Sequence, residues 1–118
     1  MDNVRLSKLA KQDIDSIWDY TEQNYGIRQA DSYTHLIEQA LNDIEENPER
    51  LGTKPRPKLG GFIRSYAISL SKDRSSPKIK SPRHIIIYTL EHEGEIFVLR
   101  ILHDSMDSER HFPDGIDK

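Results

Sequence analysis

The residues with the richest chemistry in this chain lie close to its C-terminus. His103, Asp104 and Asp107 are followed by Arg110 and His111, so imidazoles, carboxylates and a guanidinium occupy neighbouring positions. A histidine beside a carboxylate can act as a general base, and histidines with acidic neighbours can bind a metal ion. The two histidines match no short metal-binding pattern such as His-Glu-x-x-His, so the spacing gives metal binding little support. The structural alternative is a turn whose acidic side chains hydrogen-bond to the backbone.

Arg100 is a further candidate because it interrupts an otherwise apolar strand. The stretch Ile96 to Leu102 reads IFVLRIL, and alternation places Arg100 on the same face as Ile96, Val98 and Leu102. A charged side chain in such a strand either lies in a binding groove or is buried and paired. The sequence leaves both alternatives open, with Asp107 as one carboxylate that could pair with it.

The aromatic side chains are candidates for packing or recognition. Trp18 lies on the apolar stripe of a predicted helix, so we expect it in the core. Tyr20 lies off that stripe and is the better candidate for exposure. Gly60-Gly61 is followed by neither Lys-Ser/Thr nor a helix start, which argues against a phosphate-binding loop. The motifs contain no strong set of acid, base and electrophile, so binding is favoured over catalysis.

Two helices would carry these aromatic residues. Ser7 can cap a helix whose apolar residues recur every three or four positions up to Tyr25, and Gly26 supplies the conformation that ends it. A second apolar stripe runs from Ala30 to Ile44. Asn47-Pro48 stops it, because the residue before a proline avoids the helical region. The sequence therefore predicts an antiparallel helical hairpin.

The remaining segments predict a small sheet. Strands are expected at residues 4–6, 62–70, 84–90 and 96–102, and the last two flank a short turn that contains glycine. Residues 48–61 are rich in proline and glycine and are expected to form a loop. The order is β-α-α-β-β-β. It predicts an α+β fold in which the helical hairpin packs on one face of a mainly antiparallel sheet.

The length of 118 residues fits a single domain, residues 1–118, with a basic loop at 71–82 and a polar C-terminal tail at 103–118. The formal net charge is only -3, but the acidic residues concentrate in residues 1–49 and 84–118 and the basic residues in residues 50–83. Such a basic zone either binds an anionic partner or pairs with the protein's own acidic helices.

Composition also excludes several classes of protein. The chain has no cysteine, which excludes disulfide scaffolds, zinc fingers of the cysteine type and thiol nucleophiles and fits a reducing cytoplasm. No apolar run approaches the roughly 20 residues of a membrane helix, so we expect no membrane association. The N-terminus lacks the apolar stretch of a signal peptide.

Several segments together resemble one known family. The N-terminal half contributes Arg5-Leu6-Ser7, Ala10, Asp13-Ile14, Ile17-Trp18-Asp19-Tyr20, Ala30, Tyr33, Leu41, Ile44 and Asn47-Pro48. The middle contributes Arg64-Ser65-Tyr66 and His84-Ile85-Ile86-Ile87-Tyr88. The end follows the pattern Arg-x-Leu-His-x-x-Met-Asp-x-x-Arg-His at Arg100, Leu102, His103, Met106, Asp107, Arg110 and His111. In these residues, over nearly its whole length, the chain resembles the ParE-type toxins of the RelE/ParE superfamily.

The resemblance implies the toxin of a type II toxin–antitoxin system, of the kind associated with plasmid stabilisation. It implies a small bacterial cytoplasmic protein that binds and poisons DNA gyrase. A cognate ParD-like antitoxin would neutralise it in a hetero-oligomer. It implies no catalytic residue, no metal and no cofactor. The RelE branch instead cleaves mRNA on the ribosome and uses a tyrosine near the C-terminus; here no tyrosine follows Tyr88. The alternatives are such a ribonuclease, or an inactive homologue that only binds its antitoxin.

The resemblance also suggests which residues meet the two partners. The candidates for contact with the target are Arg100, His103, Met106, Asp107, Arg110, His111 and Phe112. The candidates for contact with the antitoxin are Tyr20, Tyr25, Arg64 and Tyr66. We expect the antitoxin's C-terminal segment to lie across the helical hairpin or to pair with a sheet edge.

One segment departs from the family pattern. Family members pass quickly from the Arg-Ser-Tyr strand to the next, whereas here the polar and basic residues 71–82 are inserted. They either add a contact for DNA or an acidic partner, or form a solvated loop.

Overall fold

A computed structural model describes residues 3–75 and 79–105 of the chain. Its helices are α1 (Lys8–Tyr25) and α2 (Ile27–Glu46), and its strands are β1 (Val4–Leu6), β2 (Lys54–Pro55), β3 (Ile63–Ala67), β4 (His84–Leu90) and β5 (Ile96–His103). Three short 3-10 helices in this part of the chain connect them: η1 (Pro57–Leu59), η2 (Ile68–Arg74) and η3 (His92–Gly94).

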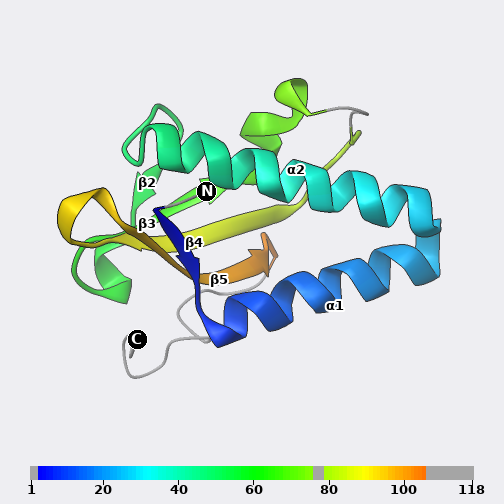
Figure 1. Cartoon of the computed structure of the whole chain (residues 1–118), viewed down its shortest axis with the longest axis horizontal. Helices are drawn as coiled ribbons and strands as arrows, with labels where there is room; N and C mark the ends of the chain where they lie inside the picture. The colour runs from blue at the N-terminus through cyan, green and yellow to red at the C-terminus, as the bar shows by residue number, and fades with distance from the viewer. Residues whose placement is uncertain (1–2, 76–78, 106–118) are drawn as a thin grey trace.

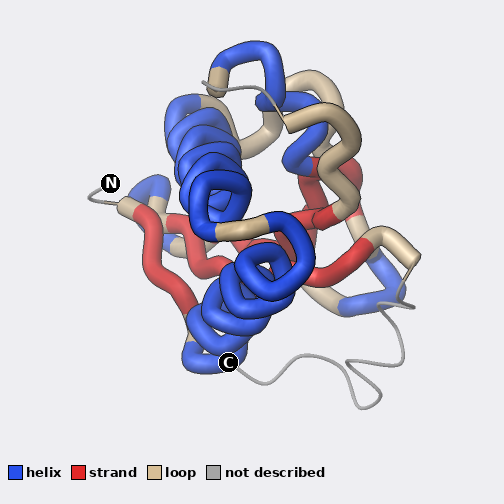
Figure 2. Tube along the Cα trace, turned by 90° about the vertical axis from the view of Figure 1, so that its right-hand side faces the viewer, coloured by secondary structure: helices blue, strands red, loops and turns tan. Residues whose placement is uncertain are grey.

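The strands form one sheet in the order β1-β5-β4-β3-β2. β1 pairs with β5 in parallel, and every other neighbouring pair is antiparallel. Both helices cover the same face of the sheet (Figure 1). Figure 2 shows the short connection between them, with the strands behind the helices. The predicted α+β architecture is confirmed.

The ends of the helices follow from the residues that the sequence singled out. The Ser7 hydroxyl accepts a hydrogen bond from the Ala10 N–H at 2.9 Å and so caps α1. Gly26 separates the helices with a φ of 91°, in the region that residues with a Cβ avoid. Asn47, which precedes Pro48, is extended and ends α2. Residues at the helix ends themselves therefore determine where the two helices begin and end.

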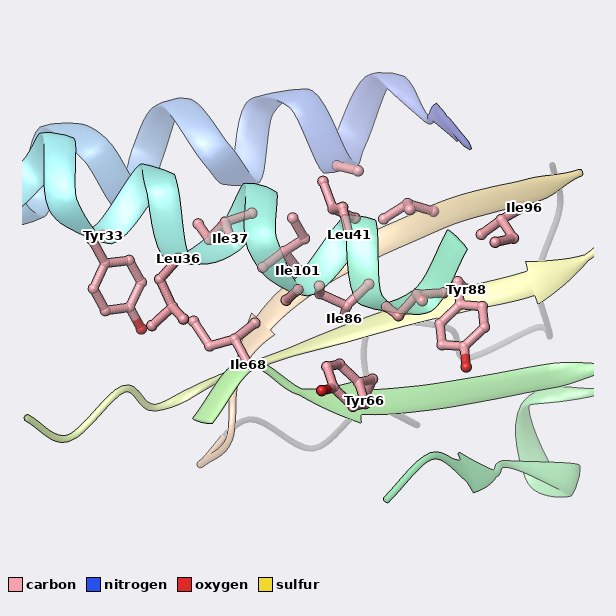
Figure 3. Close-up of a cluster of buried hydrophobic side chains, with 14 of the residues drawn as sticks. Tyr33, Leu36, Ile37, Leu41, Tyr66, Ile68, Ile86, Tyr88, Ile96 and Ile101 are labelled. Atoms are coloured by element: carbon pink, nitrogen blue, oxygen red, sulfur yellow. The ribbon is translucent and has the colours of Figure 1, made fainter. Parts of the chain in front are cut away.

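The main core lies between α2 and the sheet (Figure 3). The helix contributes fully buried side chains from one stripe: Leu36, Ile37, Ala40, Leu41 and Ile44. The strands facing it contribute Tyr66, Ile86, Tyr88, Ile96, Val98 and Ile101. A smaller cluster contains buried residues of η1, β3, β4 and β5: Leu59, Ile63, Ile87, Leu99 and Leu102.

A β-bulge changes which residues of β5 share a face. Ile87 faces Arg100 and Tyr88 faces Val98, so Leu99 is an extra residue in β5. Beyond this point the alternation is shifted by one residue. The main core therefore contains Ile96, Val98 and Ile101, and the smaller cluster contains Leu99 and Leu102. The predicted common face of Ile96, Val98, Arg100 and Leu102 is wrong after Val98.

The strand predicted at 62–70 is shorter in the structure. β3 ends at Ala67, and η2 follows at once and packs against α2. Phe62 is 77% exposed and Leu70 is 53% exposed, so both ends of the predicted strand lie at the surface. The predicted loop at 48–61 contains β2, which pairs Lys54 with Ser65, and the 3-10 helix η1.

The inserted segment is held at both of its described ends, which argues against one of its two alternatives, a solvated loop. Ser71 is fully buried, and its hydroxyl donates a hydrogen bond to the buried carboxylate of Asp43 at 2.5 Å. Arg74 lies 3.2 Å from the same carboxylate. After the gap in the described residues, Ile79 is only 5% exposed and belongs to the main core.

Two aromatic residues on α1 differ in part from the prediction. Trp18 is half-buried and lies outside both core clusters, whereas the sequence placed it in the core. Tyr25, which continues the apolar stripe, is 68% exposed because it lies at the end of the helix. Tyr20 is 62% exposed, as expected.

Candidate functional site

An ion pair joins the last strand to the first helix. Arg100 contacts both carboxylate oxygens of Asp13, with Nε 2.8 Å from Oδ2 and Nη2 2.9 Å from Oδ1. The Ile101 N–H donates to the same Oδ2 at 2.9 Å. β1 pairs with β5 only as far as Val98, so Asp13 occupies the edge that β1 leaves open. Arg100 is therefore buried and paired, and its partner is Asp13, not the Asp107 considered from the sequence.

This arrangement favours the charged form of Arg100. The hydrogen bond to Asp13 raises the pKa of the guanidinium, and the smaller effect of burial opposes it. Both side chains are largely shielded from solvent, with 16% and 14% of their surface exposed. The ion pair therefore joins the second half of β5 to α1.

A second ion pair holds the residues that follow β5. Arg83 Nε lies 2.8 Å from Asp104 Oδ2, and the Asp104 N–H donates to the Arg83 carbonyl at 2.7 Å. The Arg83 hydrogen bond lowers the pKa of Asp104. Next to it, the Ser105 hydroxyl lies 2.7 Å from His103 Nδ1. His103, a predicted target contact, is thus placed beside the start of β4.

Tyr33 and His84 form a buried pair next to His103. The Tyr33 hydroxyl lies 2.6 Å from His84 Nδ1 and accepts a hydrogen bond from the Arg83 N–H at 3.2 Å. The His84 ring packs edge-to-face against Tyr33 on one side and His103 on the other, with centroid distances of 5.5 and 5.4 Å. Figure 3 shows Tyr33 projecting from α2 toward the sheet.

Burial keeps this pair uncharged near neutral pH. Burial and, to a smaller extent, the neighbouring His103 together lower the pKa of His84 to about 4. Burial also raises the pKa of Tyr33 to about 12. A general acid or base works best with a pKa near the working pH, so neither group is tuned for proton transfer at pH 7.

These residues line a hollow of about 250 Å³, which we call the hairpin hollow. Tyr20 and Tyr25 line it from α1, and Ile79 and Lys80 line it from the segment before β4. His103 lines it from the end of β5. The structure therefore brings together two predicted antitoxin contacts and one predicted target contact.

The other two predicted antitoxin contacts lie elsewhere. Tyr66 is 1% exposed and its hydroxyl is 2.8 Å from the buried Ser71 hydroxyl, so it has no surface for a partner and that prediction is wrong. Arg64 is half-buried and donates to the Thr53 hydroxyl at 2.7 Å. With Arg56 and the exposed Phe62 it lines a second hollow of about 200 Å³.

The remaining target candidates, Met106, Asp107, Arg110, His111 and Phe112, lie outside the described residues. Within residues 3–75 and 79–105, no three His, Asp or Glu side chains gather as metal ligands would. In the same part of the chain, neither helix has the length and apolar composition to cross a bilayer.

Sequence reasoning missed several residues of the hairpin hollow. Tyr33 and His84 were named only as residues of the family resemblance, and His84 also begins a predicted strand; neither was a candidate site residue. A histidine that opens an apolar strand is a weak signal, but it could have identified His84 as a polar group in need of a partner. Nothing in the sequence pairs it with Tyr33, because the two are separated by 51 positions.

Comparisons with known proteins agree on one family. Residues 4–108 match the family model described as ParE toxin of type II toxin-antitoxin system, parDE. The chain is 31% identical over 111 residues to Toxin ParE1 of Caulobacter vibrioides, covering 94% of this chain and 98% of that one. It is 29% identical over 105 residues to Toxin ParE1 of Mycobacterium tuberculosis, covering 89% and 92%.

A solved structure has the same fold. A chain of the chromosomal ParDE TA system from P. aeruginosa superposes with a TM-score of 0.59 and 17% identity, covering 86% of this chain and 94% of that one.

Proposed function

This chain belongs to the ParE toxin family of type II toxin–antitoxin systems, and we propose that it acts in the cytoplasm by binding and poisoning DNA gyrase, with a ParD-like antitoxin as its inhibitor. The similarity to a chain of a ParDE system supports an antitoxin as partner. Gyrase as the target is inferred from the resemblance to ParE-type toxins.

The observation that carries a binding function is the set of large apolar side chains exposed on the helical hairpin. Tyr20 and Tyr25 are joined there by Ile27, which is 61% exposed, and by Leu9 at the other end of α1, which is 50% exposed. Large exposed apolar groups on a small protein are typical of surfaces that bind other proteins. A helical hairpin can receive an amphipathic segment, which is one of the two modes we expect for the antitoxin.

The proposed target surface is the end of β5 and the tail that follows it. Two ion pairs, Arg100–Asp13 and Arg83–Asp104, fix the start of this tail on the folded domain. Such anchoring fixes residues 103–105, and groups that are already fixed lose less conformational entropy on binding.

We also propose that the toxin breaks no bond itself. The uncharged state of Tyr33 and His84 supports this proposal, because a nuclease needs groups that exchange protons near neutral pH. Arg100, a largely shielded cation of β5, is held by Asp13 and is not directed at a substrate phosphate.

A supercoiling assay tests the proposal. Folded toxin at micromolar concentration should inhibit purified gyrase and cause linear, cleaved plasmid to accumulate. Prior addition of the antitoxin should prevent both effects. No inhibition by toxin shown to be folded would contradict gyrase as the target. In cells, filamentation with a DNA damage response is expected, whereas rapid loss of translation would favour a ribonuclease and absence of toxicity an inactive homologue.

A further inference from the structure

The hairpin hollow has one wall that comes from the inserted segment. Ile79 is buried in the main core. Four residues later, the Arg83 N–H donates a hydrogen bond to the Tyr33 hydroxyl, and the Arg83 side chain is hydrogen-bonded to Asp104. Lys80 and Ser81 lie between these fixed points and border the hollow. Both are exposed at the surface. In Figure 1 this segment leads into β4 beside α2.

The inner part of the hollow suits an apolar or aromatic side chain. Tyr33, His84 and Ile79 present two aromatic rings and an aliphatic group. The rings are uncharged near neutral pH, as described above. Aromatic rings pack well against such surfaces in edge-to-face or offset geometry. Tyr20 and Tyr25 add further aromatic surface at the opening.

The opening carries one available positive charge. Arg83 is already paired with Asp104, whereas Lys80 makes no ion pair within the part of the chain that the structure describes. One lysine beside an arginine that is already paired is a poor site for a nucleic-acid backbone, which is normally met by several cations. It is adequate for one carboxylate of a peptide.

We propose that the hairpin hollow is a specificity-determining subsite for the antitoxin, which places one large apolar or aromatic side chain in the hollow and pairs a neighbouring carboxylate with Lys80. This inference rests on the proposed function, because it assumes that an antitoxin binds the hairpin. It adds the inserted segment to that surface, so residues 79–83 help to decide which antitoxin this toxin accepts.

Two variants of the full-length toxin test the subsite. Ser81→Trp puts a bulky side chain at the opening, and Lys80→Glu reverses the charge there. Lys54→Glu, at an exposed lysine of β2 that does not line the hollow, is the matched control. The probe is the protein encoded next to the toxin gene, and affinity is measured by titration calorimetry at low and high salt. Thermal unfolding confirms that each variant is folded.

Ser81→Trp should weaken the complex by about thirtyfold, as expected when a central anchoring side chain is displaced. Lys80→Glu should weaken it by about fivefold at low salt and less at high salt. Lys54→Glu should stay within about twofold of the wild type. When the antitoxin's anchoring side chain is replaced with alanine, Ser81→Trp and the wild-type toxin should bind that antitoxin with the same affinity.

Two results would overturn the inference, and a third would contradict the proposed function. Folded Ser81→Trp and Lys80→Glu that bind the antitoxin as tightly as the wild type would show that the hollow is not used, while the proposed function would stand. Binding of a single-stranded oligonucleotide that Lys80→Glu abolishes, with antitoxin binding unchanged, would assign the hollow to nucleic acid. A folded wild-type toxin that forms no complex with the neighbouring protein would instead contradict the proposed function.

Discussion

Asp13 on α1 binds the Arg100 guanidinium through both of its carboxylate oxygens and, through one of them, the adjoining Ile101 N–H. One side chain therefore supports a charged residue and an unpaired strand edge together. The contacts join the first helix to the last strand across 87 positions of the chain. The tail that we propose to contact gyrase begins only a few residues further on.

Removing Asp13 should destabilise the fold. Asp13→Ala leaves a largely shielded arginine without its partner and a backbone N–H without an acceptor, which should lower the free energy of unfolding by about 2–4 kcal/mol. Asp15→Ala, at an exposed position of the same helix, should change it by less than about 0.5 kcal/mol. Urea unfolding measures both. Equal stability of the two variants would show that the pair contributes little.

The Asp43 carboxylate should hold the inserted segment in place. It accepts hydrogen bonds from Gln39 and Ser71 and lies near Arg74, and Asp43→Asn replaces one acceptor oxygen with a donor. We expect a loss of about 2 kcal/mol in unfolding free energy and faster tryptic cleavage after Arg74. Glu38→Gln on the exposed side of α2 should alter neither property. Unchanged cleavage in Asp43→Asn would mean that other contacts hold η2.

His84 should make stability depend on pH. Its pKa falls from 6.5 to about 4 on folding, so between these values the unfolded chain binds more protons than the folded one. Stability must therefore fall as the pH is lowered from 6.5 to 4, by as much as about 3 kcal/mol from this group. Urea unfolding of His84→Gln across this range should show a shallower dependence than the wild type. His35→Gln, at an exposed histidine of α2, should retain the wild-type slope, and the same slope in both variants would rule out His84 as the cause.

The exposed tyrosines of α1 should matter for binding and not for folding. Tyr20→Ala and Tyr25→Ala should each weaken the antitoxin complex by about tenfold, because aromatic anchors supply much of the energy of such interfaces. Their unfolding free energies should stay within about 0.5 kcal/mol of the wild type. Gln23→Ala, exposed on the same helix, is the control for both measurements. If both tyrosine variants bind the antitoxin with wild-type affinity, the antitoxin does not bind at this part of the hairpin.

The parts of the fold that the sequence predicts well depend on neighbouring residues. Ser7, Gly26 and Asn47 set the ends of the helices through contacts or backbone preferences that act within a few positions. β4 was predicted with both ends correct, and β5 to within one residue, because each is a continuous apolar run. In β5, alternation failed after the bulge at Leu99, because the bulge depends on how two strands pair and the sequence of neither strand indicates it.

The parts that could not be predicted depend on contacts between distant residues. Arg100 was recognised as a residue in need of an explanation, but its partner Asp13 is one of many acidic residues and only the fold selects it. Nothing in the polar stretch of helix around Asp43 indicates that this residue is buried, although it anchors the inserted segment. Tyr66 was assigned to the surface because its motif resembles the family, whereas its hydroxyl is needed inside the core.

The central claim is that this toxin works by binding, and the integrity of a transcript tests it most directly. Folded wild-type toxin is incubated with translating ribosomes and an end-labelled mRNA, and the RNA is then separated by size. The account predicts an intact transcript at toxin concentrations that fully inhibit gyrase. Cleavage by the wild type that is lost in the Arg110→Ala, His111→Ala double variant would contradict it.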